Sequence, residues 1–213
     1  MNVPRERGAP DASASGSGAA HEAAVDIVAQ ARAGSLDAWT RLYHESFDAI
    51  YRHLGYLTGD PSLAEDLTQE VFARAYVSLD RFDGRSTIVT WLYGIARKVL
   101  YKHWRRLGRR RRTPPPGIAD PIGRGGIDDA DPERLFVQQR RAAALQAAME
   151  TLPPHYREAF VLVALRELPT AEVAALLGIS RSNVSVRVHR ARARIHRELA
   201  RAGWLEAPAE EDA

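Results

Sequence analysis

The sequence contains no cysteine and no long apolar run, and each absence excludes a class of protein. Without cysteine there is no disulfide, no thiolate zinc site and no cysteine nucleophile. The longest apolar run, "AFVLVAL" at 159–165, is far shorter than the roughly 20 residues that cross a bilayer. No charged start followed by an apolar core and a small-residue cleavage site marks a secretory signal. We therefore expect a cytoplasmic protein without membrane insertion.

Acidic residues are missing from one long stretch and scarce in another. Residues 85–112 carry ten lysines or arginines and no acid, and residues 181–201 carry seven arginines against one acid, Glu198. Residues 37–83 instead carry nine acids and four bases, a pattern that the net charge of +3 conceals. Basic segments of this kind indicate a polyanionic partner, whereas the acidic segment indicates a different one.

Strand patterns are also missing, so the predicted fold is all-α. Apolar residues recur at helical spacing before and after residues 108–134, which hold five prolines and five glycines without periodicity. That composition is typical of a flexible linker. We predict two small helical domains, at 21–107 and 135–203, joined by this linker. The first 20 residues form a disordered tail and residues 204–213 an acidic one.

Residues that start helices fix several of the predicted boundaries. Asp60 can cap a helix whose first position is Pro61, where no amide hydrogen is needed. Ser86 is expected to cap the helix that follows "DRFDGRS". Pro153-Pro154 and Pro169-Thr170 each break a helix and restart it.

The stretch "TAEVAALLGISRSNVSV" has the spacing of a helix-turn-helix. Ala174 is small, as a close helix crossing requires, and Gly178 can adopt a left-handed turn at no steric cost. Ser180 can cap the second helix, and Val184 begins its apolar stripe. The second helix of such a motif enters the major groove by its N-terminal end. The second predicted domain therefore contains a helix-turn-helix.

The first turns of this helix carry side chains that suit DNA. Arginine pairs bidentately with guanine, and asparagine with adenine. A solvated arginine-rich helix in a bundle is the plainer interpretation, but such a face usually mixes both signs of charge. We predict DNA contacts from Arg181, Ser182, Asn183, Ser185, Val186, Arg187, His189 and Arg190.

The upstream basic segment interleaves aromatic and cationic residues. An apolar stripe is expected to pack inward and comprises Ile88, Trp91, Leu92, Ile95 and Val99. The side chains left more exposed are Tyr93, Arg97, Lys98, Tyr101, Lys102 and Arg105. Cations that hold the backbone and rings that stack on bases suit single-stranded nucleic acid. Trp91 fits either the core or stacking, and the run at 109–112 fits either phosphate binding or a solvated linker.

Features of a nucleic-acid enzyme are missing. No Walker-type loop is present, and "GRGG" at 123–126 lacks the lysine and the strand that such a loop needs. Glu65, Asp66 and Glu70 could be imagined as metal ligands, but no histidine accompanies them, and His189 and His196 lack ligand spacing. We expect neither catalysis nor a bound metal or cofactor.

Three segments in order resemble a known family, the extracytoplasmic-function (ECF) RNA polymerase sigma factors. "AEDLTQEVFARAY" is similar to the segment that docks on the clamp helices of the polymerase. "FDGRSTIVTWLYGIARKVLYKHWRR" resembles the promoter-melting and minus-ten segment, and "LPPHYREAFVLVALRELPTAEVAALLGISRSNVSVRVHRARARI" the minus-thirty-five reader. The likeness covers about residues 35–107 and 135–201.

The resemblance implies a sigma factor that binds core polymerase and directs promoter-specific initiation. It assigns core binding to Asp66, Gln69 and Glu70, and minus-thirty-five duplex DNA to the second helix of the helix-turn-helix. The loop 83–87 and the helix after it would capture an extruded base of the melted non-template strand. The residues so implied for minus-ten DNA are Arg85, Ser86, Thr87, Tyr93, Arg97, Lys98, Tyr101, Lys102 and Arg105. The family often has an anti-sigma factor, which becomes a candidate partner.

Two residues depart from the family pattern. Lys98 stands where the family often has asparagine beside the base pocket, and Ser185 stands where it commonly has lysine or arginine. We expect an altered base preference in the minus-ten pocket. With Ser185 and Val186, we expect an upstream element that either differs from the usual one or is bound more weakly. The alternative function is a helix-turn-helix regulator that is not a polymerase subunit, but it leaves the "AEDLTQEVF" surface unexplained.

Overall fold

The structure is a computed structural model, and it describes residues 26–108 and 132–205. All regular elements of these two ranges are helices, in agreement with the predicted all-α fold. Among these helices, none combines the length and the hydropathy that a membrane span requires. The predicted N-terminal tail, nearly all of the predicted linker and most of the acidic tail lie outside the described residues.

The N-terminal domain consists of a short helical segment at 26–32 followed along the chain by three long helices. The long helices are α2 (Leu36–Thr58), α3 (Pro61–Ser78) and α4 (Ile88–Gly108), and a 3₁₀ turn, η1 (Leu79–Arg81), follows α3. Each of the three packs against the other two. Their shared core is apolar and includes Ile50, Leu54, Val71 and Leu92, none of which is measurably exposed.

The helix starts follow from local capping. The Asp60 carboxylate accepts the Leu63 amide hydrogen at 3.1 Å, and Pro61 occupies the first turn of α3, as predicted. The prediction that Ser86 caps α4 is wrong, because the Thr87 hydroxyl accepts the Thr90 amide hydrogen at 3.1 Å instead. Ser86 donates to the Thr87 carbonyl.

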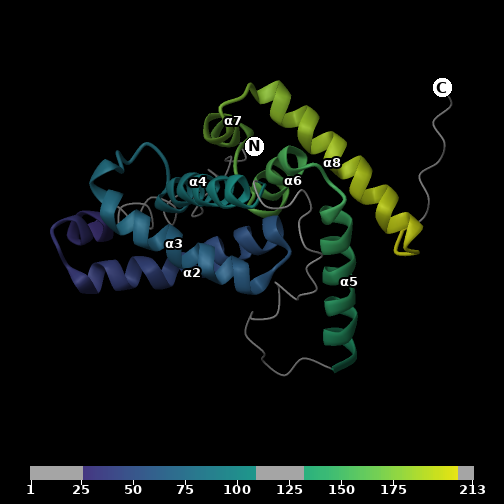
Figure 1. Cartoon of the computed structure of the whole chain (residues 1–213), viewed down its shortest axis with the longest axis horizontal. Coiled ribbons are helices and arrows are strands. Elements are labelled where there is room, and N and C mark those ends of the chain that lie inside the picture. The colour runs from purple at the N-terminus through teal and green to yellow at the C-terminus, as the bar shows by residue number, and fades with distance from the viewer. Residues whose placement is uncertain (1–25, 109–131, 206–213) are drawn as a thin grey trace, which may run out of the picture.

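The C-terminal domain is built around one long helix. Its elements are α5 (Pro132–Glu150), α6 (Pro154–Phe160), the π-helical turn η2 (Val161–Leu165), α7 (Thr170–Leu177) and α8 (Arg181–Arg201). The predicted breaks before Pro154 and Thr170 are confirmed. Helix α8 contacts α5, α6 and α7, and runs across the domain from α7 to the side of α5 (Figure 1).

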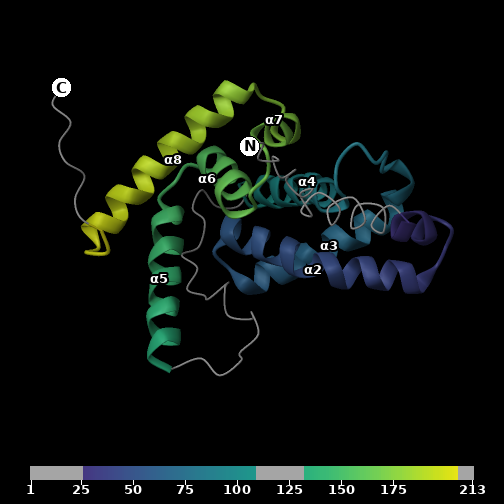
Figure 2. The same ribbon diagram turned by 180° about the vertical axis from the view of Figure 1, so that it is seen from behind.

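The two domains pack against each other. Helix α2 contacts α6 and η2. In both views α4 lies between α2 and α3 on one side and α6 and α7 on the other (Figure 1, Figure 2). The buried apolar residues of both domains form one continuous cluster. We call this contact surface the seam. It is formed by α2 and α4 of the N-terminal domain and by α5, α6, η2 and α7 of the C-terminal domain.

Candidate nucleic-acid interface

Helices α7 and α8 form the predicted helix-turn-helix. Gly178 ends α7 with φ of +69°, the left-handed conformation that glycine adopts without steric cost. The Ser180 hydroxyl caps α8 by accepting the Asn183 amide hydrogen at 3.2 Å. Ala174 is 7% exposed and Val184 is fully buried, so the small residue and the apolar stripe occupy the crossing of the two helices. This local geometry agrees with each step of the sequence prediction.

The predicted DNA-contacting side chains of α8 surround the helix everywhere except at its buried apolar stripe. Arg181, Ser182, Asn183, Ser185, Val186, His189 and Arg190 are exposed, and Arg187 is half-buried. Arg187 donates to the Asn183 side-chain oxygen at 3.1 Å, and Arg190 donates to the Tyr156 hydroxyl at 3.0 Å. These bonds restrict the side chains before any ligand arrives, which lowers the entropy cost of binding.

Two uncharged residues of this set differ in what they offer a base. The Ser185 hydroxyl donates to the Arg181 carbonyl at 3.2 Å, so its donor is already used within the helix. Val186 is 47% exposed, which is unusual for an aliphatic side chain among exposed cations. An exposed apolar side chain in the major groove can contact the methyl group of thymine.

The predicted DNA residues of α4 are placed less uniformly. Lys98, Lys102 and Arg105 are exposed, whereas Arg97 and Tyr101 are half-buried. The expectation that Tyr93 is exposed is wrong: it is 3% exposed, and its ring centroid lies 4.6 Å from that of His53 on α2. Helical periodicity placed Tyr93 off the apolar stripe, but it could not show that α2 and the C-terminal domain cover that side of α4.

Arg97 and Tyr101 are both bound by one carboxylate of the other domain. Arg97 Nε lies 3.0 Å from Oε1 of Glu158, and the Tyr101 hydroxyl donates to Oε2 at 3.1 Å. The Glu158 side chain is only 6% exposed. Burial raises the pKa of Glu158, and the Arg97 guanidinium opposes that shift.

The inward stripe of α4 is confirmed at Leu92 and Val99, which are buried, while Ile88, Trp91 and Ile95 are half-buried. Trp91 packs edge-on against Phe82, with ring centroids 5.6 Å apart. On its other side Trp91 lines an open cavity of about 690 Å³ between α3 and α4, together with Ile95 and Lys98. Trp91 is therefore both a packing residue and part of a surface hollow.

The loop before α4 carries the three remaining minus-ten residues. Arg85 and Thr87 are exposed and Ser86 is half-buried. Asp83 pairs with the Arg85 side chain at 3.1 Å and also accepts the Arg85 amide hydrogen at 3.1 Å. Gly84 has φ of +74°, so the backbone turns sharply here and presents Arg85 at the tip.

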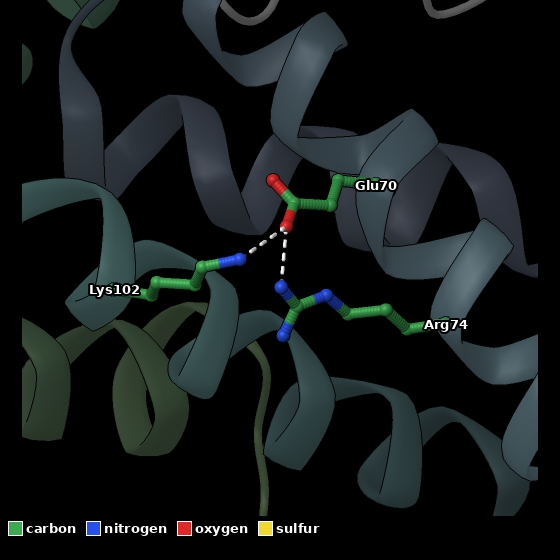
Figure 3. A network of polar contacts seen from close by, with 3 residues as sticks. All are labelled: Glu70, Arg74 and Lys102. Atoms are coloured by element: carbon green, nitrogen blue, oxygen red, sulfur yellow. Dashed lines mark hydrogen bonds and ion pairs between the residues drawn. The ribbon is translucent and has the colours of Figure 1, made fainter.

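The predicted polymerase-binding residues lie on α3. Asp66 and Gln69 are exposed, and Glu70 is half-buried. Glu70 makes an ion pair with Arg74 one turn later, and its Oε1 lies 3.7 Å from Nζ of Lys102 on α4 (Figure 3). A predicted polymerase contact, Glu70, is therefore paired with a predicted DNA contact, Lys102.

Family models match both domains. Residues 42–110 match the model described as sigma-70 region 2, and residues 142–195 match the one described as sigma-70, region 4. The chain is 30% identical to the ECF RNA polymerase sigma factor SigW of Bacillus subtilis, over 81% of this chain and 94% of SigW. It belongs to the ECF sigma factors. We refer to its two domains as region 2 and region 4.

Other members of the family are similarly related. SigC of Mycobacterium tuberculosis is 33% identical over 80% of this chain and 88% of its own length. SigE of Mycolicibacterium smegmatis is 34% identical over 78% of this chain. The match spans only 63% of the length of SigE. Sigma factors are non-catalytic subunits of RNA polymerase.

Two solved structures have a similar fold. RpoE of Bartonella quintana, solved in complex with the anti-sigma factor NepR, has a TM-score of 0.63 at 22% identity, over 77% of this chain and 98% of RpoE. CnrH, solved in complex with the cytosolic domain of CnrY, has a TM-score of 0.58 at 25% identity, over 81% of this chain and 94% of CnrH.

The sequence analysis missed an aromatic groove in region 2. This open groove of about 510 Å³ lies between α2 and α3, and Gln69 lines it beside Trp39, Tyr43 and Tyr76. Tyr76 is 60% exposed, and its ring contacts that of Trp39 edge-on, with ring centroids 5.1 Å apart. The sequence could have predicted this groove from Trp39 and Tyr43. The two residues are four apart on one helix, and this spacing puts both rings on one face.

Proposed function

We propose that this sigma factor binds core bacterial RNA polymerase through α3, reads minus-thirty-five duplex DNA with α8, and captures melted minus-ten DNA with the loop 83–87 and α4. One observation carries the proposal: the exposed cationic first turns of α8 and the acidic face of α3 occur in a single chain, in the family's order. A DNA-binding protein that works without polymerase has no need of the second surface.

The role of α8 is supported by its geometry and charge. Arg181, Asn183 and Arg187 lie on consecutive turns at the N-terminal end, which is the end that enters the major groove in a helix-turn-helix. Val186 adds an apolar contact beside them. We assign base-edge contacts to this end, and phosphate contacts to His189 and Arg190 further along.

The role of α4 and the loop before it is supported by two groups of side chains. Exposed Arg85, Lys98 and Lys102 can hold the phosphates of a single strand. The cavity lined by Trp91, Ile95 and Lys98 offers an aromatic wall for an extruded base. Extrusion costs a few kcal/mol, so bound polymerase has to supply part of the stabilisation.

We assign core docking to Asp66 and Glu70 together with the aromatic groove beside Gln69. The groove adjoins the acidic residues, because Gln69 lines the groove and directly precedes Glu70 on α3. Large exposed rings such as Tyr76 next to charged residues are typical of the centre and rim of a protein interface. Core polymerase is the proposed occupant of this combined surface.

The remaining assignments concern the whole chain. We propose region 2 at 21–107 and region 4 at 135–203, with residues 108–134 as the tether that lets both regions engage one promoter. We propose a cytoplasmic location, where polymerase acts. An anti-sigma factor is a proposed further partner, since members of the family often have one.

Run-off transcription with bare core polymerase tests the proposed function. Core polymerase alone should give no specific product from fragments of the chain's own genome, and addition of the full chain should give defined transcripts. A regulator would give product only when another sigma factor is present. The proposal fails if the chain yields no transcript from any fragment and does not compete with another sigma factor for core.

A further inference from the structure

The loop before α4 is held at its start by a residue from the beginning of region 2. Nε of Arg32, at the end of the helical segment 26–32, donates to the Leu79 carbonyl in η1 at 3.1 Å. The same carbonyl accepts the Phe82 amide hydrogen at 3.0 Å, which closes the 3₁₀ turn. Arg32 is therefore bound to the backbone turn that leads directly into the loop 83–87.

Arg32 also approaches the aromatic pair behind the loop. Its Cζ lies 5.9 Å from the centroid of the Phe82 ring, within the range of a cation–π contact. Phe82 is only 6% exposed and packs edge-on against Trp91, which lines the cavity between α3 and α4. Arg81, from the turn that Arg32 holds, lines the same cavity. Two parts of the cavity wall are thus connected to Arg32 through η1 and Phe82.

Arg32 extends from a backbone that is itself fixed. A Schellman motif ends the segment 26–32, and in it the Gly34 and Ser35 amide hydrogens are donated back to carbonyls of the last turn, both at 3.1 Å. The Ser35 hydroxyl then caps α2. The segment is fastened to the core of region 2 by three buried apolar side chains, those of Ile27, Val28 and Ala31. The guanidinium of Arg32 is thus presented to η1 from a firm support.

The loop has few other contacts that could fix its start. Among the described residues, no other side chain from outside residues 79–90 hydrogen-bonds η1 or the loop. The ion pair between Asp83 and Arg85 lies within the loop and is largely exposed, so water weakens it. The Thr87 hydroxyl fixes the end of the loop where α4 begins. The start of the loop depends on η1, and η1 is held from outside by Arg32.

We propose that Arg32 is a positioning residue for minus-ten recognition: it fixes η1 and Phe82, and so keeps the loop 83–87 and the Trp91 side of the cavity in the geometry that receives an extruded base. Arg32 acts through these groups and does not itself contact DNA. This proposal rests on the assignment of the loop and the cavity to minus-ten DNA in the proposed function. It adds a residue outside the loop and α4 to those that set promoter preference, because a site with a loose supporting shell discriminates poorly.

The first test measures the mobility of η1 in the free chain and involves no DNA. Because the chain has no cysteine, Asp80→Cys allows a single nitroxide label to be attached at an exposed position of η1. The electron paramagnetic resonance lines of this label should narrow when Arg32→Ala is added, since the turn loses its anchor. Arg32→Lys keeps a charged donor at this position and should leave the spectrum nearly unchanged. Arg41→Ala is the matched control, because Arg41 pairs with Glu45 on the surface of α2 and its loss should not affect the label.

The second test measures promoter preference with the holoenzyme. In run-off transcription from a promoter library randomised over the minus-ten element, Arg32→Ala should lose about fivefold of its discrimination at one position, the one whose base enters the cavity. The preferences at the other positions should not change, and Arg32→Lys should restore most of the lost discrimination. Ile50→Val controls for stability: it trims a fully buried side chain of α2 and leaves the contacts of Arg32 in place. It should lower the melting temperature without changing the preference.

An unchanged label spectrum or an unchanged promoter preference in Arg32→Ala would overturn the positioning role. An equal loss at every minus-ten sequence would overturn it as well, because that pattern marks a phosphate contact. So would a change of preference in Ile50→Val as large as that in Arg32→Ala. If the label loosens in Arg32→Ala but the wild-type chain gives no run-off product with core polymerase, the result counts instead against the proposed function, and the anchoring of η1 by Arg32 stands.

Discussion

Helices α4 and α8 have similar length and similar charge, yet their cations are in different situations. On α8 the predicted DNA contacts face outward, and the bonds they make, such as Arg187 to Asn183, lie within region 4. On α4 the Arg97 side chain is bound by a buried carboxylate from the other region. The contrast shows that the predicted DNA contacts of α8 are accessible, whereas region 4 covers part of the predicted DNA-contacting side of α4.

The largest expected effect concerns the proposed polymerase-binding surface on α3, which lies on neither of the two DNA-binding helices. Asp66→Arg with Glu70→Arg reverses two charges on α3, and we expect core polymerase binding to weaken by more than about 4 kcal/mol, roughly a thousandfold. Co-purification with tagged core measures this directly. Asp66→Arg alone is the necessary comparison, because Glu70 also pairs with Lys102 and its reversal disturbs the DNA face (Figure 3). Unchanged core binding in the double variant would remove these residues from the docking surface.

The next prediction addresses the exposed helix. Arg181→Ala with Arg187→Ala should weaken binding of the free chain to minus-thirty-five duplex by about 3 kcal/mol and reduce the slope of log K against log salt by about two. Fluorescence anisotropy at several salt concentrations measures both quantities.

The matched control for the exposed helix is Arg192→Ala with Arg194→Ala, which removes the same charge from the same helix beyond the predicted contact residues. It should cost the chain much less affinity. Arg97→Ala, in contrast, should hardly change duplex binding by the free chain, since Glu158 already holds that guanidinium. A loss as large as that of the α8 variant would contradict the difference between the two helices.

The third prediction concerns pH and the covered side of region 2. Burial, with a smaller contribution from Arg166, lowers the pKa of His53 to about 3. Because an unfolded histidine titrates near pH 6.5, the unfolded chain binds the extra proton first, so the folded state loses stability as pH falls from about 6.5 toward 3. The loss between pH 6.5 and 5 should be about 2 kcal/mol, and urea unfolding at pH 7 and pH 5 measures it.

His53→Leu is the variant that isolates this effect. Burial raises the pKa of Glu158, so protonation of Glu158 acts in the opposite direction and stabilises the folded state as pH falls through its raised pKa. Only the difference between wild type and His53→Leu therefore reports on the histidine. Equal loss of stability in both chains between pH 7 and pH 5 would show that His53 is not held neutral by burial.

Local physics explains how far the sequence could predict this structure. Asp60 before Pro61 and Ser180 after Gly178 are signals confined to a few residues, and each helix starts where they indicate. The apolar stripe of α8 is also local, since a period of 3.6 residues needs no knowledge of the partner helix. For the same reason the outward-facing side chains of α8 could be named from the sequence alone.

The seam could not be predicted in this way. Glu158 sits in "PHYREAF" with nothing in its neighbourhood that distinguishes it from a solvated surface acid, and its partners Arg97 and Tyr101 are about 60 residues away. Tyr93 was misplaced for the same reason, because its burial depends on α2 and on region 4. Pairings between distant elements are set by how whole helices pack, which periodicity within one helix does not report.

The smallest expected effect tests whether α4 reads a base of the minus-ten element. Lys98 lines the cavity beside Trp91, so Lys98→Asn should change the preference at one minus-ten position by about 1 kcal/mol while leaving the other positions unaltered. Run-off transcription from a promoter library randomised over the minus-ten element gives the preference at every position. Lys102→Asn is the matched control: this lysine pairs with Glu70 instead of lining the cavity, so its loss should weaken all sequences evenly, as a phosphate contact does. Identical profiles for the two variants would place Lys98 among the phosphate contacts and leave α4 as a helix that holds the melted strand without reading it.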